Sequence, residues 1–240
     1  PDQQAAADAM LAHDDGILTA TTAFGKTVVA AWLIAARKVN TLVLVHRRQL
    51  LDQWRERLAT FLNLPIKSIG QIGGGRRRPS GRVDVAVIQS LNRKQVVDDV
   101  VANYGHVIVD ECHHISAVSF EQVLRQVKAR YITGLTATPQ RKDGHHPIII
   151  MQCGPIRHRV DAKAQALARP FNHVVIPRPT NFRLPPSTEK PEMHELYAAL
   201  AGNKARNDLI CVDLVSAIKA SRSPILLTER TSQVDEFATR

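Results

Sequence analysis

Residues 17–31 read Ile-Leu-Thr-Ala-Thr-Thr-Ala-Phe-Gly-Lys-Thr-Val-Val-Ala-Ala, an apolar run, a short turn and the start of a helical stretch. A turn between strand and helix binds phosphate when backbone N–H groups face the ligand, a glycine allows close approach, a lysine neutralises charge and a hydroxyl holds Mg²⁺. Gly25, Lys26 and Thr27 supply the last three requirements. This stretch therefore predicts a strand, a phosphate-binding loop and a helix, although an ordinary turn that contains Gly-Lys-Thr by chance remains the alternative.

Two alanines stand where the general phosphate-loop pattern has glycine. Ala20 replaces the opening glycine, and Ala23 replaces a further glycine that is often found before the last one. An alanine forced to positive φ costs about 1 kcal/mol, which the loop tolerates if it is otherwise held in place.

The same alternation of apolar runs and helical stretches continues as far as residue 138. Runs rich in Val, Ile and Leu cover residues 17–20, 41–45, 83–88, 106–109 and 131–135, and stretches of helical period cover residues 26–37, 48–61, 92–103 and 120–127. Buried runs that alternate with helices predict a parallel sheet covered on both faces, in the α/β doubly wound class. Ligands bind such sheets beyond the carboxyl ends of the strands, so we expect functional residues there.

Composition narrows the class of protein. The chain has 240 residues, of which 44% are hydrophobic, and this is enough for a packed core in one or two domains. Its formal net charge of +10 favours an acidic partner, usually nucleic acid. Three dispersed cysteines support neither a disulfide framework nor a zinc ribbon, so we expect a reducing, cytoplasmic setting. No membrane span or export signal is visible, and the start at Pro1 suggests an excerpt from a longer protein.

Prolines divide the chain. Six of them lie between residues 170 and 191, where they resist both helix and central strand. We therefore expect a first domain at residues 1–168, a linker at 169–191 and the truncated start of a second domain at 192–240. In this last part the pattern predicts helices at 192–200 and 203–220 and a buried strand at 225–227.

A second polar segment follows the predicted strand at residues 106–109, and it reads Asp110-Glu111-Cys112-His113. An aspartate here can hold Mg²⁺ through water, and a glutamate beside it can orient or deprotonate an attacking water, as phosphoryl transfer requires. A pair of exposed acids at a strand end is the alternative. Histidines are nearby, but no second ligand pair stands at the spacing of a zinc finger.

In combination, these segments resemble the superfamily 2 helicases and translocases of the DEAD/DEAH-like kind, near the type III restriction-enzyme helicase subunits. The matching motifs are Ala20, Thr22, Gly25, Lys26 and Thr27; Asp110 to His113; and Thr136-Ala137-Thr138. The resemblance implies a RecA-like first lobe, ATP and Mg²⁺ as cofactors, and closure on a second lobe. Residues near 225–230 are similar to the opening of that second lobe, whose remaining motifs, including the arginine fingers, would lie beyond residue 240. The fragment alone would then hydrolyse ATP poorly.

The resemblance also implies roles for individual residues. The expected catalytic residues are Lys26, Asp110 and Glu111, and the expected nucleotide-binding residues are Gln3, Thr22, Gly25, Lys26 and Thr27. Mg²⁺ would be bound by Thr27 and Asp110. The residues expected to couple hydrolysis to the nucleic-acid track are His113, Thr136, Ala137 and Thr138. Gln3 resembles the glutamine with which the family recognises adenine.

Nucleic acid is the predicted partner, with DNA favoured over RNA by the resemblance. The densest basic stretch, residues 73–82, contains Arg76, Arg77, Arg78 and Arg82, whose binding to phosphates should weaken steeply with salt. Arg48 and Ser90 stand where the family touches backbone phosphates. A solvated surface loop is the alternative for the arginines. Two other functions stay open: a different P-loop NTPase, and a degenerate lobe that holds nucleotide and nucleic acid without turnover.

Overall fold

The computed structural model describes residues 2–93, 96–114, 118–137, 146–161, 174–183 and 192–239. The chain divides into two compact units, Pro1–Phe171 and Asn172–Arg240. Among the described helices, none has both the length and the apolar character needed to cross a lipid bilayer.

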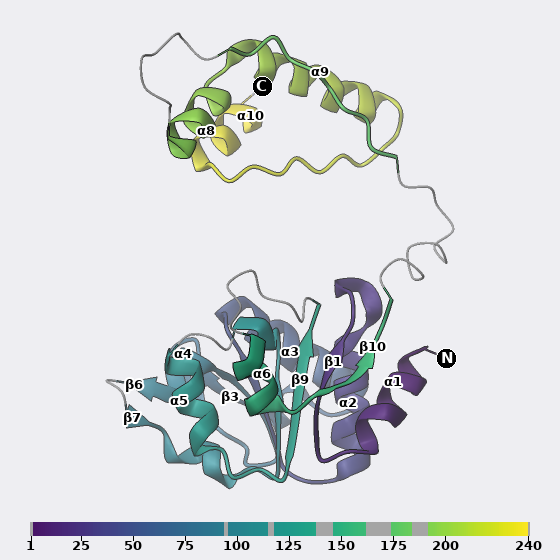
Figure 1. Ribbon diagram of the computed structural model, residues 1–240, viewed down its shortest axis with the longest axis vertical. Helices are drawn as coiled ribbons and strands as arrows, with labels where there is room; N and C mark the ends of the chain where they lie inside the picture. The colour runs from purple at the N-terminus through teal and green to yellow at the C-terminus, as the bar shows by residue number, and fades with distance from the viewer. Residues whose placement is uncertain are drawn as a thin grey trace. The chain divides into compact units, whose positions relative to one another are not determined.

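An eight-stranded sheet forms the centre of the first unit, in the order β10-β1-β9-β8-β2-β5-β3-β4 (Figure 1). The strands are β1 (Asp15–Thr19), β2 (Thr41–Val45), β3 (Ile69–Gly73), β4 (Arg76–Arg78), β5 (Val83–Val87), β8 (His106–Val109), β9 (Tyr131–Thr136) and β10 (Ile156–Arg159). Neighbouring strands pair in parallel, except that β4 runs antiparallel to β3. The predicted α/β class and largely parallel sheet are therefore confirmed.

Helices cover both faces of this sheet (Figure 1). The helices are α1 (Asp2–Leu11), α2 (Lys26–Arg37), α3 (Arg48–Phe61), α4 (Ile88–Leu91), α5 (Val118–Gln126) and α6 (His146–Cys153), with 3-10 turns η1 (Thr22–Phe24), η2 (Ile66–Ser68), η3 (Asp99–Asn103) and η4 (Cys112–His114). Alternate residues of β2 enter two separate cores, because successive side chains of a strand point to opposite faces. Val43 and Val45 pack with α1, α2 and α3. Leu42 and Leu44 pack with α4, α5 and α6.

A cluster of polar side chains lies at the amino edge of the sheet, where β8 and β9 begin. The Nε2 atom of buried His106 lies 2.8 Å from Nη1 of Arg37 and 3.1 Å from Oγ1 of Thr133. The Arg37 guanidinium also lies over the Tyr131 ring, 4.5 Å from its centroid. This cluster joins the end of α2 to two central strands.

The predicted helix at residues 92–103 is wrong. The chain instead forms an antiparallel hairpin of β6 (Asn92–Arg93) and β7 (Val96–Val97), followed by η3. The β-branched residues Val96 and Val97 favour a strand, and the Asp98 side chain accepts a hydrogen bond from the N–H of Val100, which starts η3 separately. Local capping therefore interrupts a stretch whose apolar spacing is compatible with one helix.

The second unit contains α8 (Met193–Ala201), α9 (Lys204–Lys219) and α10 (Thr231–Ala238). The predicted buried strand at residues 225–227 is wrong, because Ile225 and Leu227 are 84% and 87% exposed and the segment is not part of a strand. A strand needs a neighbour for its backbone N–H and C=O groups. The described part of this unit offers helices instead. Residues 174–183, within the proline-rich stretch, form neither helix nor strand.

Candidate active site

The phosphate loop joins β1 to α2 and turns through η1. Gly25 adopts the left-handed conformation, with φ 92° and ψ 38°, and α2 begins at Lys26. The backbone angle favours glycine, and a Cβ atom added to Gly25 would lie 2.4 Å from Nε2 of Gln3, so the end of that side chain would have to move. Ala23 lies within the right-handed turn η1, and neither it nor Ala20 has positive φ. The two alanines therefore impose no strain of the kind considered for them.

Gln3 reaches this loop from α1. Its Nε2 atom donates a hydrogen bond to the backbone oxygen of Phe24 at 2.7 Å. The structure thus brings Gln3 to the loop, where it supports the turn before Gly25, and its predicted contact with adenine stays a prediction.

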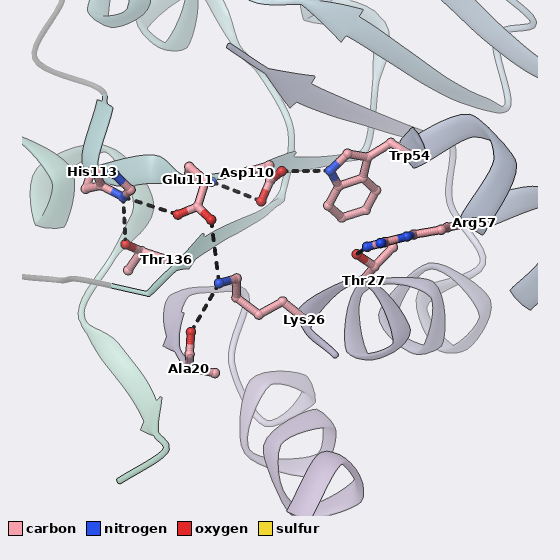
Figure 2. Close-up of polar contacts among 9 residues, drawn as sticks. All are labelled: Ala20, Lys26, Thr27, Trp54, Arg57, Asp110, Glu111, His113 and Thr136. Carbon is pink, nitrogen blue, oxygen red and sulfur yellow. Dashed lines mark hydrogen bonds and ion pairs between the residues drawn. The ribbon is translucent and has the colours of Figure 1, made fainter. Parts of the chain in front are cut away.

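Lys26 and the acidic pair meet at the carboxyl edge of the sheet (Figure 2). The Nζ atom of buried Lys26 lies 3.1 Å from the backbone oxygen of Ala20 and 3.6 Å from Oε1 of Glu111. Glu111 itself has φ 47°, an uncommon angle for a residue with a side chain, which turns the chain sharply after β8. A charged lysine and a carboxylate therefore face each other at the mouth of the loop.

Asp110 is held through both of its oxygens. Oδ1 accepts a hydrogen bond from the backbone N–H of Glu111 at 3.0 Å, and Oδ2 accepts one from Nε1 of Trp54 at 2.7 Å (Figure 2). Burial raises the pKa of Asp110, and the hydrogen bond from Trp54 acts in the opposite direction. Burial thus disfavours the ionised form of the carboxyl, and the hydrogen-bond donors around it favour that form.

Of the predicted coupling residues, His113 contacts the acidic pair. Nδ1 of His113 lies 3.0 Å from Oγ1 of Thr136 and 3.3 Å from Oε2 of Glu111 (Figure 2). Ala137 follows Thr136 directly, and Thr138 lies outside the described residues. His113 therefore bridges the end of β9 and the Glu111 carboxylate.

A cavity of about 560 Å³ lies over these groups. It is lined by Thr22, Ala23, Gly25, Lys26, Thr27, Val28, Leu50, Gln53, Trp54, Arg57, Phe61, Asp110 and Glu111. The volume is in the range of small-molecule and cofactor sites. The oxygens of Thr27 and Asp110 on this cavity are hard ligands of the kind that Mg²⁺ takes from proteins beside substrate phosphates, so the residues fit that ion.

The contribution of α3 to this cavity was not predicted from the sequence. Leu50, Trp54, Arg57 and Phe61 recur at helical spacing, which places them on one face of α3. Nη1 of Arg57 lies 3.5 Å from Oγ1 of Thr27. The spacing of these four residues, on a predicted helix that follows a strand of the same sheet, could have indicated that α3 lines the cavity.

Several predicted nucleic-acid residues lie around the turn of the β3–β4 hairpin. A Cβ atom on Gly73 would lie 2.8 Å from Oγ of Ser90, and one on Gly74 would lie 3.1 Å from Nε of Arg48. Both side chains follow the carboxyl ends of strands, on the same edge as the cavity. The predicted flexible loop is thus partly a strand, β4, whose three arginines are exposed.

The predicted arginines differ in their surroundings. Arg77 forms an ion pair with Asp98, in which Nη2 of the arginine donates to Oδ1 at 3.0 Å. Arg76, Arg78 and Arg82 are exposed to solvent. Arg77 is therefore partly neutralised, while its neighbours present their charge outward.

A largely parallel sheet with a phosphate loop after β1 and an acidic pair after β8 defines a RecA-like P-loop domain. Residues 1–141 match the sequence model of the family described as type III restriction enzyme, res subunit. The chain belongs to this family, which lies within the DEAD/DEAH-like superfamily 2 helicases.

Three similar proteins illustrate the relationship. A putative ATP-dependent RNA helicase, L396, of Acanthamoeba polyphaga mimivirus is 27% identical over 92% of this chain and 43% of its own length. The DNA 3'-5' translocase XPB2 of Sulfurisphaera tokodaii is 32% identical over 65% of this chain and 34% of its own. The UvsW helicase structure from bacteriophage T4 has a TM-score of 0.55 and 19% identity, covering 65% of this chain and 58% of that one. The chain thus spans less than half the length of these two curated relatives.

Proposed function

We propose that this protein is an ATP-dependent motor on nucleic acid that hydrolyses ATP with Mg²⁺. One observation carries the proposal: Lys26 and Glu111 face each other at 3.6 Å over a cavity that Thr27 and Asp110 also line. A phosphate-binding lysine, a candidate base and two Mg²⁺-compatible oxygens thus meet at one site. This combination supports hydrolysis of the nucleotide over binding alone.

Each side chain has a distinct part in this proposal. Lys26 and the backbone N–H groups of the loop bind the terminal phosphates, and Thr27 and Asp110 would hold Mg²⁺. The bound ion would neutralise charge that develops on the transferred phosphoryl group. Glu111 orients the attacking water and accepts its proton. His113, at 3.3 Å from Oε2 of Glu111, keeps that carboxylate turned toward the loop.

The nucleic acid would bind along the hairpin turn, through its phosphates. Arg48 and Ser90 lie beside this turn, and the arginines of β4 and Arg82 add positive charge. Contacts of this kind position a strand without reading its sequence. We favour DNA as the track, and an RNA track remains the competing outcome, since relatives are named for each.

The rest of the machine belongs to the proposal as well. In it, residues 169–191 link the ATP-binding lobe, residues 1–168, to a second RecA-like lobe that opens at residues 192–240. Hydrolysis would take place in the cleft between the two lobes once the second is complete. The free thiols of Cys112, Cys153 and Cys211 agree with a reducing, cytoplasmic compartment.

Steady-state ATPase assays of the full-length protein test this function, with duplex DNA, single-stranded DNA and RNA as separate additions. We expect stimulation by one polymer, loss of nucleotide binding in Lys26→Ala, and retained binding with turnover lowered by about 10²- to 10⁴-fold in Glu111→Gln. Unchanged hydrolysis in Glu111→Gln would remove the assigned base. Mg²⁺-dependent binding without turnover in the wild type would instead favour the degenerate lobe.

A further inference from the structure

The Asp110 carboxylate has a donor that the recognised motifs do not include. Trp54 lies on α3, which follows β2, and its Nε1 atom is 2.7 Å from Oδ2 of Asp110, 56 positions away in the chain. The indole is almost fully enclosed, at 4% exposure. A side chain from the helix that follows β2 therefore fixes one oxygen of the acidic pair.

The chemistry of indole makes this contact specific. Its N–H can only donate, so a buried tryptophan needs an acceptor, whereas a buried phenylalanine needs none. A separation of 2.7 Å lies at the short end of the range for N–H···O hydrogen bonds. Since each carboxylate oxygen has two lone-pair sites, one bond to Trp54 leaves Oδ2 able to accept a second. The bond thus sets the orientation of the carboxylate without blocking it.

The same helix also reaches the other oxygen proposed to face Mg²⁺. Arg57 lies three residues after Trp54, and its Nη1 atom is 3.5 Å from Oγ1 of Thr27. Both residues line the cavity over the phosphate loop. Side chains on one face of α3 are thus directed at Asp110, directly after β8, and at Thr27, in the first turn of α2.

We propose that Trp54 is a positioning residue for Mg²⁺–nucleotide binding: its indole N–H holds the Asp110 carboxylate in the orientation that accepts the ion or its bound water. This inference rests on the proposed function, because it assigns Asp110 to the Mg²⁺ site. Trp54 itself touches neither the nucleotide nor the ion in this scheme.

The substitution Trp54→Phe tests it in the full-length protein, because an aromatic side chain, although a smaller one, is kept and the donor is lost. We expect the Mg²⁺ concentration for half-maximal ADP binding to rise by about 10- to 100-fold, as is typical when a partner of a metal ligand is removed. ADP binding at saturating Mg²⁺ should be nearly unchanged. The chain has two tryptophans, and Trp32→Phe is the matched control, since Trp32 lies on α2 and is 49% exposed.

A spectroscopic measurement keeps the inference testable if Trp54→Phe folds poorly. In a Trp32→Phe variant of the 240-residue chain, Trp54 is the one tryptophan left, so the emission should change when Mg²⁺ is added to the ADP-bound protein. The same titration with Asp110→Asn should leave the emission unchanged. Emission that does not respond to Mg²⁺ in the Trp32→Phe protein, or an unaltered Mg²⁺ requirement in folded Trp54→Phe, overturns the role of Trp54. Failure of the wild type to bind Mg²⁺–ADP would instead overturn the proposed function.

Discussion

Acidification should destabilise the first unit through His106. Burial lowers the pKa of His106 to about 3, and the neighbouring Arg37 guanidinium acts in the same direction. In the unfolded chain, histidine titrates near pH 6.5. Between these two values the unfolded state binds a proton that the folded state does not, so stability falls as the pH falls. The loss begins near pH 6.5 and is complete near pH 3.

The magnitude follows from the difference between the two pKa values. A pH of 5 is about 1.5 units below the pKa of histidine in the unfolded chain. At about 1.4 kcal/mol per unit, the free energy of unfolding at pH 5 is therefore about 2 kcal/mol lower than at pH 8. A loss of this size is a large part of the stability of a typical domain, so it is measurable.

Urea unfolding followed by tryptophan fluorescence provides the assay, because Trp32 and Trp54 both belong to the first unit. The wild type and His106→Gln are compared at pH 8 and pH 5. Other titrating groups are shared by both proteins, so the variant should lose about 2 kcal/mol less than the wild type between the two pH values. Equal losses in the two proteins would refute a neutral, buried His106.

Two further predictions concern the carboxyl edge. Gly25→Ala should weaken ADP binding by at least ~10-fold, because the left-handed backbone of the loop disfavours a residue with a Cβ atom and the Gln3 side chain, 2.4 Å from that atom, would have to move. Gly81→Ala is its control in a calorimetric titration, since Gly81 shares positive φ but does not line the cavity, and equal losses in both variants would contradict a local effect on the loop. Arg76→Gln should weaken DNA binding and reduce the slope of log affinity against log salt by about one. The control is Arg130→Gln, which changes an exposed arginine beside the amino edge of the sheet and should leave the slope unaltered. Fluorescence anisotropy measures both slopes, and an unchanged slope in Arg76→Gln would show that the hairpin is not part of the interface.

Strong periodicity made part of the fold predictable. The expected strand at residues 41–45 and the helices at 26–37 and 48–61 have the observed bounds, because each carries an uninterrupted apolar pattern that tertiary packing reinforces. The phosphate loop and the acidic pair were also found, since the chemistry restricts the residue types at fixed spacing. The prediction of a helix at residues 92–103 was wrong because the side chain of Asp98 caps η3 and competes locally with a continuous helix.

Contacts across the sheet were beyond the sequence patterns. The hydrogen bond between Trp54 and Asp110 joins α3, the helix after β2, to the residue after β8, and these two strands become neighbours only through the strand order. Residues 225–227 show the converse, because an apolar run forms a strand only when another strand can pair with it. Local patterns specified which elements form, and pairing in space decided how their side chains meet.

Substitutions at the two edges of the central sheet should have different consequences in evolution. The polar cluster of His106, Arg37 and Tyr131 ties elements together at one edge, whereas Lys26 and Glu111 stand at the other. Each edge terminates the same strands, yet the two sets of side chains have no member in common. Under the proposed mechanism, a lineage would lose turnover through one substitution at Glu111 and still inherit an intact scaffold. Descendants of such a chain would keep the fold and serve other purposes with it.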